Sequence, residues 1–213
     1  MLLRKKLEGV SKSRHFLTFK PSSSENLHFL VLHENHVSLF ELSKNLENNN
    51  FYLKTVLKSK LSFSKNNLLE SSLFFNFKNH DYISLSSCDN KVHIYELNEN
   101  TELNFLNHLQ GHTNKIKEMT FTEINGNGYL ASGSLDNYIR IWGFRPIDEL
   151  ESRYKKSKYV YYINDSHFVT LDSVLFGHTE AISGVKFFKD IQGKSNFFFK
   201  FIYNYKYLIY KQK

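Results

Sequence analysis

Side chains with the chemistry to attack a substrate or hold a metal are sparse in this chain. Ten histidines are present, and His112 and His178 each follow a glycine, where an imidazole could act as a general base or metal ligand. No Cys/His cluster has zinc spacing, no glycine-rich loop could cradle a phosphate, and no nucleophile elbow occurs. Asp89 and Asp136 lie in separate turns and do not form a hydrolase pair. The sequence therefore predicts no catalytic residue, no cofactor and no metal site, and we expect structural roles for both histidines.

The stretch 110–142 combines a Gly-His opening, a strand–turn–strand signal and a closing tryptophan. It resembles a WD40 propeller blade. In that family the aspartate of the tight turn accepts from the loop histidine, the histidine reaches a strand serine, and the serine reaches the indole N–H, a donor that needs a partner when buried. The resemblance implies a structural tetrad made of His112, Ser132, Asp136 and Trp142.

The same frame recurs along the chain, which a chance match would not do. An acidic residue precedes an aromatic residue by six positions in three pairs, Glu34 and Phe40, Asp89 and Tyr95, and Asp136 and Trp142. Gly9 precedes Phe40 by 31 residues, as Gly111 precedes Trp142, so residues 7–10 look like a decayed Gly-His opening. The acidic turns are 55 and 47 residues apart, longer than the roughly 40–45 of a compact repeat, so we expect the extra length in loops.

These spacings predict an all-β, partial WD40 β-propeller of about three four-stranded blades and the first strand of a fourth. The repeat region covers 1–188, with blades at roughly 7–58, 71–109 and 110–176 and the start of the next at 177–188. In the third blade we expect strands over 116–121, 128–134, 138–144 and 168–176, with Asn125-Gly126 in a hairpin turn that tolerates positive φ. Residues 145–167 form a polar insertion whose length favours a binding or mobile loop.

The aromatic and basic tail, 189–213, departs from this pattern because it has neither an acidic turn nor a recognisable third strand. Its residue types are those of A/T-rich codons, so translated non-coding sequence or a misplaced exon boundary is one interpretation, and a genuine edge strand is the other. The chain has a net charge of +7, of which +5 lies in this tail and +2 in residues 1–188. We favour a scatter of solvated lysines over a specific phosphate-binding face.

Composition narrows the class of protein. A hydrophobic content of 41% with 16% aromatic residues argues against disorder. The single cysteine, Cys88, excludes an internal disulfide and fits a reducing compartment, and its place before Asp89 predicts a small buried strand residue. Residues 1–6 lack the apolar run of a secretory signal, and the stretch 197–210 is too short and too polar for a membrane span. We expect a soluble intracellular protein.

Three blades do not close a propeller, a fold that protects its sheet edges by radial closure. An open arc leaves apolar faces between blades exposed. We therefore expect this chain to be part of a longer propeller or to be completed by another chain.

A narrower resemblance covers roughly 81–188, about half of the chain. After Ile139-Arg140-Ile141-Trp142 come a charged insertion and a returning stretch from Phe168-Val169-Thr170-Leu171 to Gly177-His178. This order looks like the WD-repeat second subunit of the Elongator complex. That family commonly has an acidic residue and then a tryptophan soon after Gly-His, whereas Thr113-Asn114-Lys115 and Thr179-Glu180-Ala181 follow here. The departure puts the local surface contacts in doubt more than the fold.

The resemblance implies a non-catalytic scaffold with two seven-bladed propellers that binds the largest Elongator subunit and the radical-SAM, acetyltransferase-like third subunit. That assembly modifies the wobble uridine of certain tRNAs, so we expect tRNA contact only through the complex, in cytoplasm and nucleus, with no membrane and no small-molecule substrate. The alternative is an unrelated WD40 module, such as a ubiquitin-ligase substrate receptor or a chromatin peptide reader that binds a peptide at the central channel. Direct RNA binding by the basic tail is a third interpretation.

Overall fold

The computed structural model describes residues 15–33, 36–45, 50–59, 69–150, 154, 157–189, 195–200 and 207–210. Within these ranges β-strands dominate and form four antiparallel sheets, which confirms the predicted all-β class. A helix of sufficient length and apolarity to span a membrane does not occur among the described residues. Gly9 and Glu34, the glycine and the turn acid predicted for the first blade, lie outside the described residues.

Sheets 1 and 2 each contain four strands that follow one another in the chain, and sheet 3 contains five. Sheet 1 contains β1 (His15–Phe19), β2 (Leu27–Leu32), β3 (Val37–Asn45) and β4 (Asn50–Ser59). Sheet 2 contains β5 (Leu69–Phe77), β6 (His80–Ser87), β7 (Val92–Leu97) and β8 (Leu103–Leu109). Sheet 3 contains β9 (Ile116–Ile124), β10 (Asn127–Ser134), β11 (Ile139–Pro146) and β13 (His167–Leu175), with β12 (Val160–Tyr162) added on the outer edge of β13. The predicted strands of the third blade are thereby confirmed.

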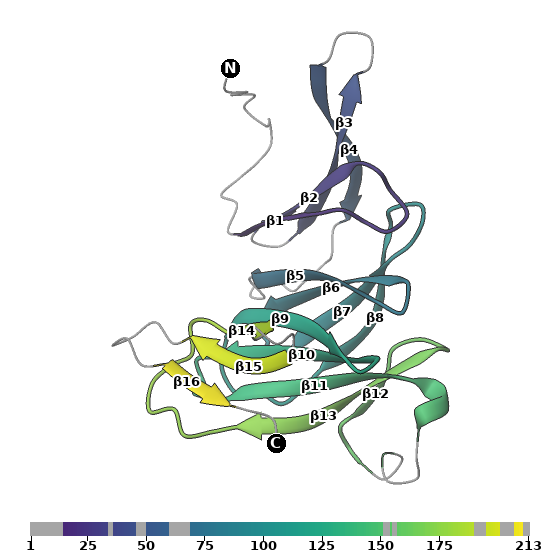
Figure 1. Ribbon diagram of the computed structural model, residues 1–213. Helices are drawn as coiled ribbons and strands as arrows, with labels where there is room; N and C mark the ends of the chain where they lie inside the picture. Colours follow the sequence, from purple (N-terminus) through teal and green to yellow (C-terminus); the bar gives the residue numbers. More distant parts are fainter. Residues whose placement is uncertain are drawn as a thin grey trace.

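The sheets follow one another as the blades of a propeller arc do, with their first strands on the inner side (Figure 1). Strand β1 packs beside β5, β5 beside β9, and β9 beside β14 (Lys186–Lys189) of sheet 4. Because alternate residues of a strand point to opposite faces, sheets 2 and 3 each present one apolar face to the preceding sheet and one to the next.

Three apolar clusters fill the spaces between neighbouring sheets. The cluster between sheets 1 and 2 includes Leu30, Leu39, Leu85 and Tyr95, and the one between sheets 2 and 3 includes Phe75, Phe77, Tyr82, Trp142 and Phe144. Between sheets 3 and 4 lie Ala131, Ile139, Ile141, Ile182 and Val185. The core is therefore divided into layers, and each layer lies between two neighbouring sheets that cover it from either side.

A β-bulge marks the same place in each of the first three sheets. The register between the third and the fourth strand shifts just before the repeated aromatic residue, at Leu39/Phe40, at Ile94/Tyr95 and at Ile141/Trp142. A bulge bends a strand and redirects its side chains. The aromatic spacing found in the sequence therefore corresponds to a repeated backbone feature.

Asparagine takes the left-handed conformation in the tight turns. Asn90 and Asn137, which follow the turn acids Asp89 and Asp136, have φ of 63° and 68°. Asn125 and Gly126, with φ of 52° and 78°, form the hairpin turn between β9 and β10 that the sequence predicts. These residue types adopt positive φ at little energetic expense.

Two parts of the chain are more regular than the sequence predicts. The insertion 145–167 is not a loop throughout, because it contains the 3₁₀ turn Ile147–Glu149 and strand β12. In the tail, β15 (Ser195–Lys200) pairs with β14, and β16 (Tyr207–Tyr210) pairs with β15. Sheet 4 therefore has three strands, whereas the sequence predicts its first strand and offers an edge strand in the tail as one of two interpretations. Aromatic and β-branched residues favour strands even without a turn acid or a repeat motif.

Candidate functional site

The four residues predicted as a structural tetrad meet on the face of sheet 3 that packs against sheet 2. His112 lies in the β8–β9 connection, Ser132 on β10, Asp136 in the β10–β11 turn and Trp142 on β11. Trp142 Nε1 donates to Ser132 Oγ over 2.9 Å, and Ser132 Oγ lies 2.8 Å from His112 Nε2. His112 Nδ1 lies 2.9 Å from Asp136 Oδ2. A continuous chain of hydrogen bonds connects the indole to the turn carboxylate.

The Asp136 carboxylate fixes the proton directions because it can only accept, so Nδ1 of His112 donates to it. In a neutral imidazole Nε2 is then an acceptor, so Ser132 Oγ donates its hydrogen to Nε2 and accepts the indole N–H of Trp142. This arrangement needs a neutral imidazole, and burial lowers the pKa of His112.

The Asp136 carboxylate accepts from several further donors. The backbone N–H groups of Thr113 and Tyr138 each lie 3.0 Å from it, and Arg140 Nη1 lies 3.1 Å from Oδ2, an acceptor that it shares with His112. Burial raises the pKa of Asp136, but the hydrogen bonds outweigh burial and hold this pKa well below its ordinary value. Asp136 therefore stays ionised and ties the β8–β9 connection to the β10–β11 turn.

Serine, histidine and aspartate are also the residue types of a hydrolase triad, but this arrangement differs in two respects. The serine oxygen accepts the indole N–H, and the side chains of His112 and Asp136 are only 1% and 2% exposed. Ser132 and Trp142 are fully buried. With no open face for a substrate, the four side chains act as a structural clamp.

Sheet 2 holds its turn acid with a different partner. Ser87 Oγ donates to Asp89, the backbone N–H of Lys91 lies 3.2 Å from its Oδ1, and His93 Nε2 lies 3.0 Å from its Oδ2. Burial raises the pKa of Asp89, but the hydrogen bonds with His93 and Ser87 outweigh burial and lower it to about 2. The sequence analysis missed His93, although it lies four residues after the turn acid, as Arg140 does in sheet 3.

Cys88 is not the buried strand residue that the sequence predicts. It lies in the turn after β6, where it is half-buried, because the strand ends at Ser87. Its Sγ lies 3.5 Å from Oε1 of Glu70, a carboxylate that also accepts from Lys115 (3.0 Å) and Lys117 (2.9 Å). This cluster joins the first strands of sheets 2 and 3.

Strand β12 of the insertion pairs with sheet 3 and also contacts the end of sheet 2, so it forms a strap between the two sheets. The Tyr161 hydroxyl lies 3.1 Å from both the N–H and the carbonyl of Gln110, and Asn107 Nδ2 donates to the carbonyl of Tyr162 over 2.9 Å. The ring of Tyr161 also meets Trp142 edge to face, with centroids 6.2 Å apart. The second half of the insertion therefore covers the tetrad and holds the outer strand of sheet 2.

Arg145 anchors the other end of the insertion. Its Nη2 lies 2.6 Å from Oδ2 of Asp172, and its Nη1 donates to Thr170 Oγ1 over 2.9 Å. Asp172 is the extra residue of the bulge, since Trp142 pairs with Leu171 and Ile141 pairs with Ser173. The bulge thus directs a carboxylate toward the start of the insertion.

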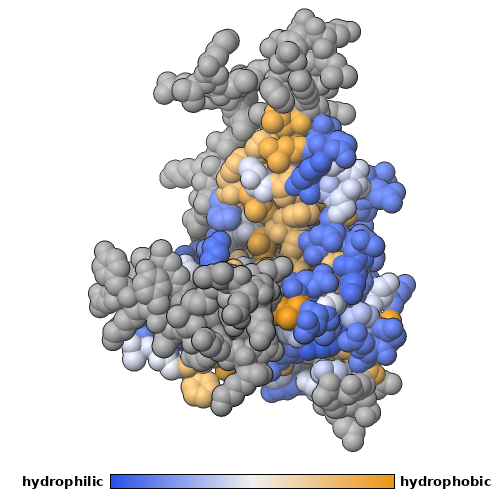
Figure 2. All heavy atoms as spheres, in the orientation of Figure 1, coloured by the Kyte–Doolittle hydropathy of each residue, from blue (hydrophilic) through white to orange (hydrophobic). Residues whose placement is uncertain are grey.

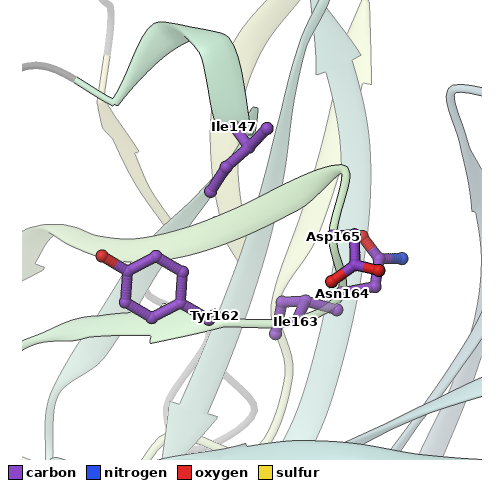
Figure 3. Close-up of a pocket in the computed structure, with 5 residues that line it drawn as sticks. All are labelled: Ile147, Tyr162, Ile163, Asn164 and Asp165. Carbon is purple, nitrogen blue, oxygen red and sulfur yellow. The ribbon is translucent and has the colours of Figure 1, made fainter.

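A pocket of about 430 Å³ opens on the insertion itself, lined by Ile147, Tyr162, Ile163, Asn164 and Asp165 (Figure 3). Asn164 is committed to the turn, because its Oδ1 accepts from the N–H groups of Ser166 (3.0 Å) and His167 (2.8 Å). Its Nδ2 donates to the Tyr82 hydroxyl of sheet 2 over 3.2 Å. The floor of the pocket is therefore fixed to the neighbouring sheet.

A second hollow, of about 490 Å³, lies between the turns of sheets 1 and 2. Its polar lining includes His80, whose Nδ1 lies 2.6 Å from Glu96 Oε1, and Asp81, which accepts from the backbone and the hydroxyl of Ser22. His178, the other histidine of a Gly-His pair, lies half-buried between β13 and β14. In the described part of the chain, no three His, Cys, Asp or Glu side chains gather as metal ligands would.

The comparisons with known proteins agree with this geometry. The family model "WD domain, G-beta repeat" matches residues 103–143, so the chain contains a WD40 repeat. The match begins on β8 of sheet 2 and includes β9, β10 and most of β11 of sheet 3, so the sequence repeat is offset by one strand from the structural blade. The pair Gly111-His112 lies in the β8–β9 connection, where the chain passes from sheet 2 to sheet 3.

Solved structures with the same fold include two chains of Polycomb assemblies. One is a chain from the structure of ctPRC2 in complex with H3K27me3 and H3K27M, with a TM-score of 0.60 and 14% sequence identity. The alignment covers 88% of this chain and 34% of that chain. A chain of the Chaetomium thermophilum Polycomb Repressive Complex 2 bound to GSK126 has a TM-score of 0.59 and 17% identity, over 88% of this chain and 40% of that chain. A search of curated proteins found no match. These likenesses show the fold, a partial WD40 propeller, and this chain spans about a third to two-fifths of those chains.

Proposed function

We propose that this chain is part of a non-catalytic WD40 scaffold, and that the scaffold is the second subunit of the Elongator complex. In that role it holds the largest subunit and the radical-SAM third subunit by protein–protein contacts. It supports modification of the tRNA wobble uridine without contributing a catalytic residue, and it reaches tRNA only through the complex. Cytoplasm and nucleus are the compartments that this role implies.

The observation that carries the proposal is the insertion and its returning strand. A blade whose third strand contains Ile-Arg-Ile-Trp is followed by a long insertion, then by β13, and then by the next Gly-His pair. Most of the specificity of the resemblance lies in this order, because single WD40 motifs are shared by many unrelated proteins. The strap contacts of β12 support the proposal further, since they give the insertion a defined position on the rim.

The buried tetrad and the polar rim support a scaffold rather than an enzyme. The side chains of the tetrad's serine, histidine and aspartate are closed to substrates, and the turns along the right-hand edge of Figure 2 form a polar surface. Multi-loop rims of this kind suit contacts with other proteins.

Sheet 1 supports the idea that further blades complete the propeller. Phe16 and Leu27 are 56% and 41% exposed, and Phe16 packs on Phe29 with centroids 5.4 Å apart. Their strand neighbours Leu17 and Leu30 pack toward sheet 2, so alternation places Phe16, Leu27 and Phe29 on the opposite face. An apolar sheet face of this kind is covered by the next blade in a propeller.

The proposal can be tested in cells that lack the gene. We expect the modified wobble uridine to disappear from digested tRNA, as measured by mass spectrometry of nucleosides. Wild-type protein should restore it, and so should a variant with Cys88→Ser, a matched control outside the tetrad. An unchanged level of modified uridine in the deletion strain would contradict the proposal and favour an unrelated WD40 recognition module.

A further inference from the structure

The pocket on the insertion combines apolar walls with a free carboxylate. Figure 3 shows Ile147 on one side, Ile163 just after β12 opposite to it, the Tyr162 ring at one end and Asp165 at the other. Ile163 is 4% exposed, whereas Tyr162 is 53% exposed. An exposed aromatic ring beside buried aliphatic side chains is a surface that a partner can cover.

The two polar side chains of the pocket differ in what they are free to bind. Asn164 uses its oxygen and its amide within the turn and against Tyr82. Asp165, at the exposed tip of the same turn, makes no hydrogen bond or ion pair with the residues that the structure describes. The turn, held by the hydrogen bonds of Asn164, therefore presents one carboxylate that has no partner among the described residues.

The carboxylates around the pocket favour a ligand with a positive charge. Asp148 and Glu149 directly follow Ile147 in the 3₁₀ turn, and both are exposed. With Asp165 they place three carboxylates at this end of the insertion, in a protein whose overall charge is +7. A phosphate would be repelled here, and a cation would be attracted.

We propose that this pocket binds a lysine or arginine side chain on the surface of a partner protein. The aliphatic stem packs on the Tyr162 ring, Ile147 and Ile163, and the cationic head lies at the Asp165 carboxylate at the other end of the pocket. This inference deepens the proposed scaffold role, on which it rests, by naming the chemistry of the partner. Because Asn164 is already held by Tyr82, little conformational entropy is lost when the site fills.

A peptide titration of the purified full chain tests the pocket directly. The probes are three fluorescein-labelled peptides that differ at one central position, which is lysine, norleucine or glutamate. Norleucine keeps the aliphatic stem without the charge. Fluorescence anisotropy should show that the lysine peptide binds more tightly than the norleucine peptide by about threefold or more, and that the glutamate peptide binds least.

Two variants and a matched control assign the binding to the pocket. Asp165→Asn and Tyr162→Leu should each weaken binding of the lysine peptide by about threefold. Glu25→Gln makes the same change in net charge on sheet 1, at a carboxylate paired with Lys20, and should leave binding unchanged. Circular dichroism of each variant checks that the fold is intact.

Several results would overturn the inference. These are equal binding of the lysine and norleucine peptides, an equal loss with Glu25→Gln and Asp165→Asn, or no binding of any peptide. None of them bears on whether the protein assembles with Elongator subunits, which is measured separately in cells. Failure of the pocket and failure of the scaffold proposal are therefore distinguishable.

Discussion

Replacing Ser132 by alanine removes the central atom of the tetrad. Ser132 Oγ accepts from Trp142 and donates to His112, and all three side chains are buried. The change leaves the indole N–H and the imidazole Nε2 without a partner, and each such group destabilises a protein by about 1–3 kcal/mol. We therefore expect the free energy of unfolding to fall by about 2–6 kcal/mol, which is a drop in melting temperature of roughly 4–24 °C for a domain of this size.

Ser84→Ala is the matched control for this experiment. Ser84 is also fully buried on a strand, but its Oγ has no hydrogen-bond partner in the described structure. Removing that oxygen should leave stability unchanged or raise it by about 1 kcal/mol. The comparison separates the loss of two hydrogen bonds from the effect of a small volume change in a strand.

Urea denaturation followed by fluorescence is the assay, because Trp142 is the single tryptophan of the sequence and lies in the tetrad. A double-mutant cycle with Trp142→Phe then measures the coupling between the indole and the hydroxyl, with unfolding of all four proteins followed by circular dichroism because Trp142→Phe removes the tryptophan signal. If Ser132→Ala and Ser84→Ala lowered the midpoint equally, or if the cycle gave no coupling, the assignment of the tetrad as a stabilising clamp would be refuted.

Three further changes test other parts of the structure. Because the pKa of Asp89 is about 2 when folded and 3.8 ordinarily, its stabilising effect is fully present above about pH 4 and is lost as the pH falls toward 2. Melting curves across that window should therefore fall more steeply for the wild type than for Asp89→Asn, and parallel curves would contradict the assignment. Tyr161→Phe removes both hydroxyl contacts with Gln110 and should destabilise by about 1 kcal/mol and speed proteolysis within the insertion, whereas Tyr162→Phe should change neither. Glu70→Gln breaks the ion pairs with Lys115 and Lys117 and should destabilise by at most about 1 kcal/mol, an effect that 1 M salt, at about 3 Å Debye length, should abolish if the pairs act through charge.

Repeated local signals made the propeller predictable from the sequence. The turn acid and the aromatic residue six positions later recur in the sequence because the third and fourth strands of sheets 1 to 3 share a bulge, and the described turns of sheets 2 and 3 share a left-handed asparagine. The tetrad residues could be named because residues 110–142 resemble a WD40 blade, and that resemblance implies which side chains hold the buried indole. Side chains that make their contacts within one repeat therefore recur at a fixed spacing in the sequence.

Contacts between neighbouring repeats could not be predicted, because no recurring sequence pattern marks them. Strand β12 is only three residues long, too short for alternation to show, and its position depends on Tyr161 reaching Gln110 in the preceding connection. The residue four positions after the turn acid is His93 in sheet 2 and Arg140 in sheet 3. Because the residue type differs between the two repeats, the sequence pattern did not reveal the partner of Asp89. The binding pocket likewise depends on the turn that Asn164 forms after β12.

Affinity purification of the tagged full-length protein from its own cells, with mass spectrometry of the recovered proteins, tests the central proposal most directly. The scaffold proposal predicts that the largest Elongator subunit and the radical-SAM subunit are recovered in amounts comparable to the tagged protein. Ser132→Ala, which weakens the fold, should reduce that recovery, and Ser84→Ala should not. Recovery of the tagged protein without any Elongator subunit would contradict the proposal.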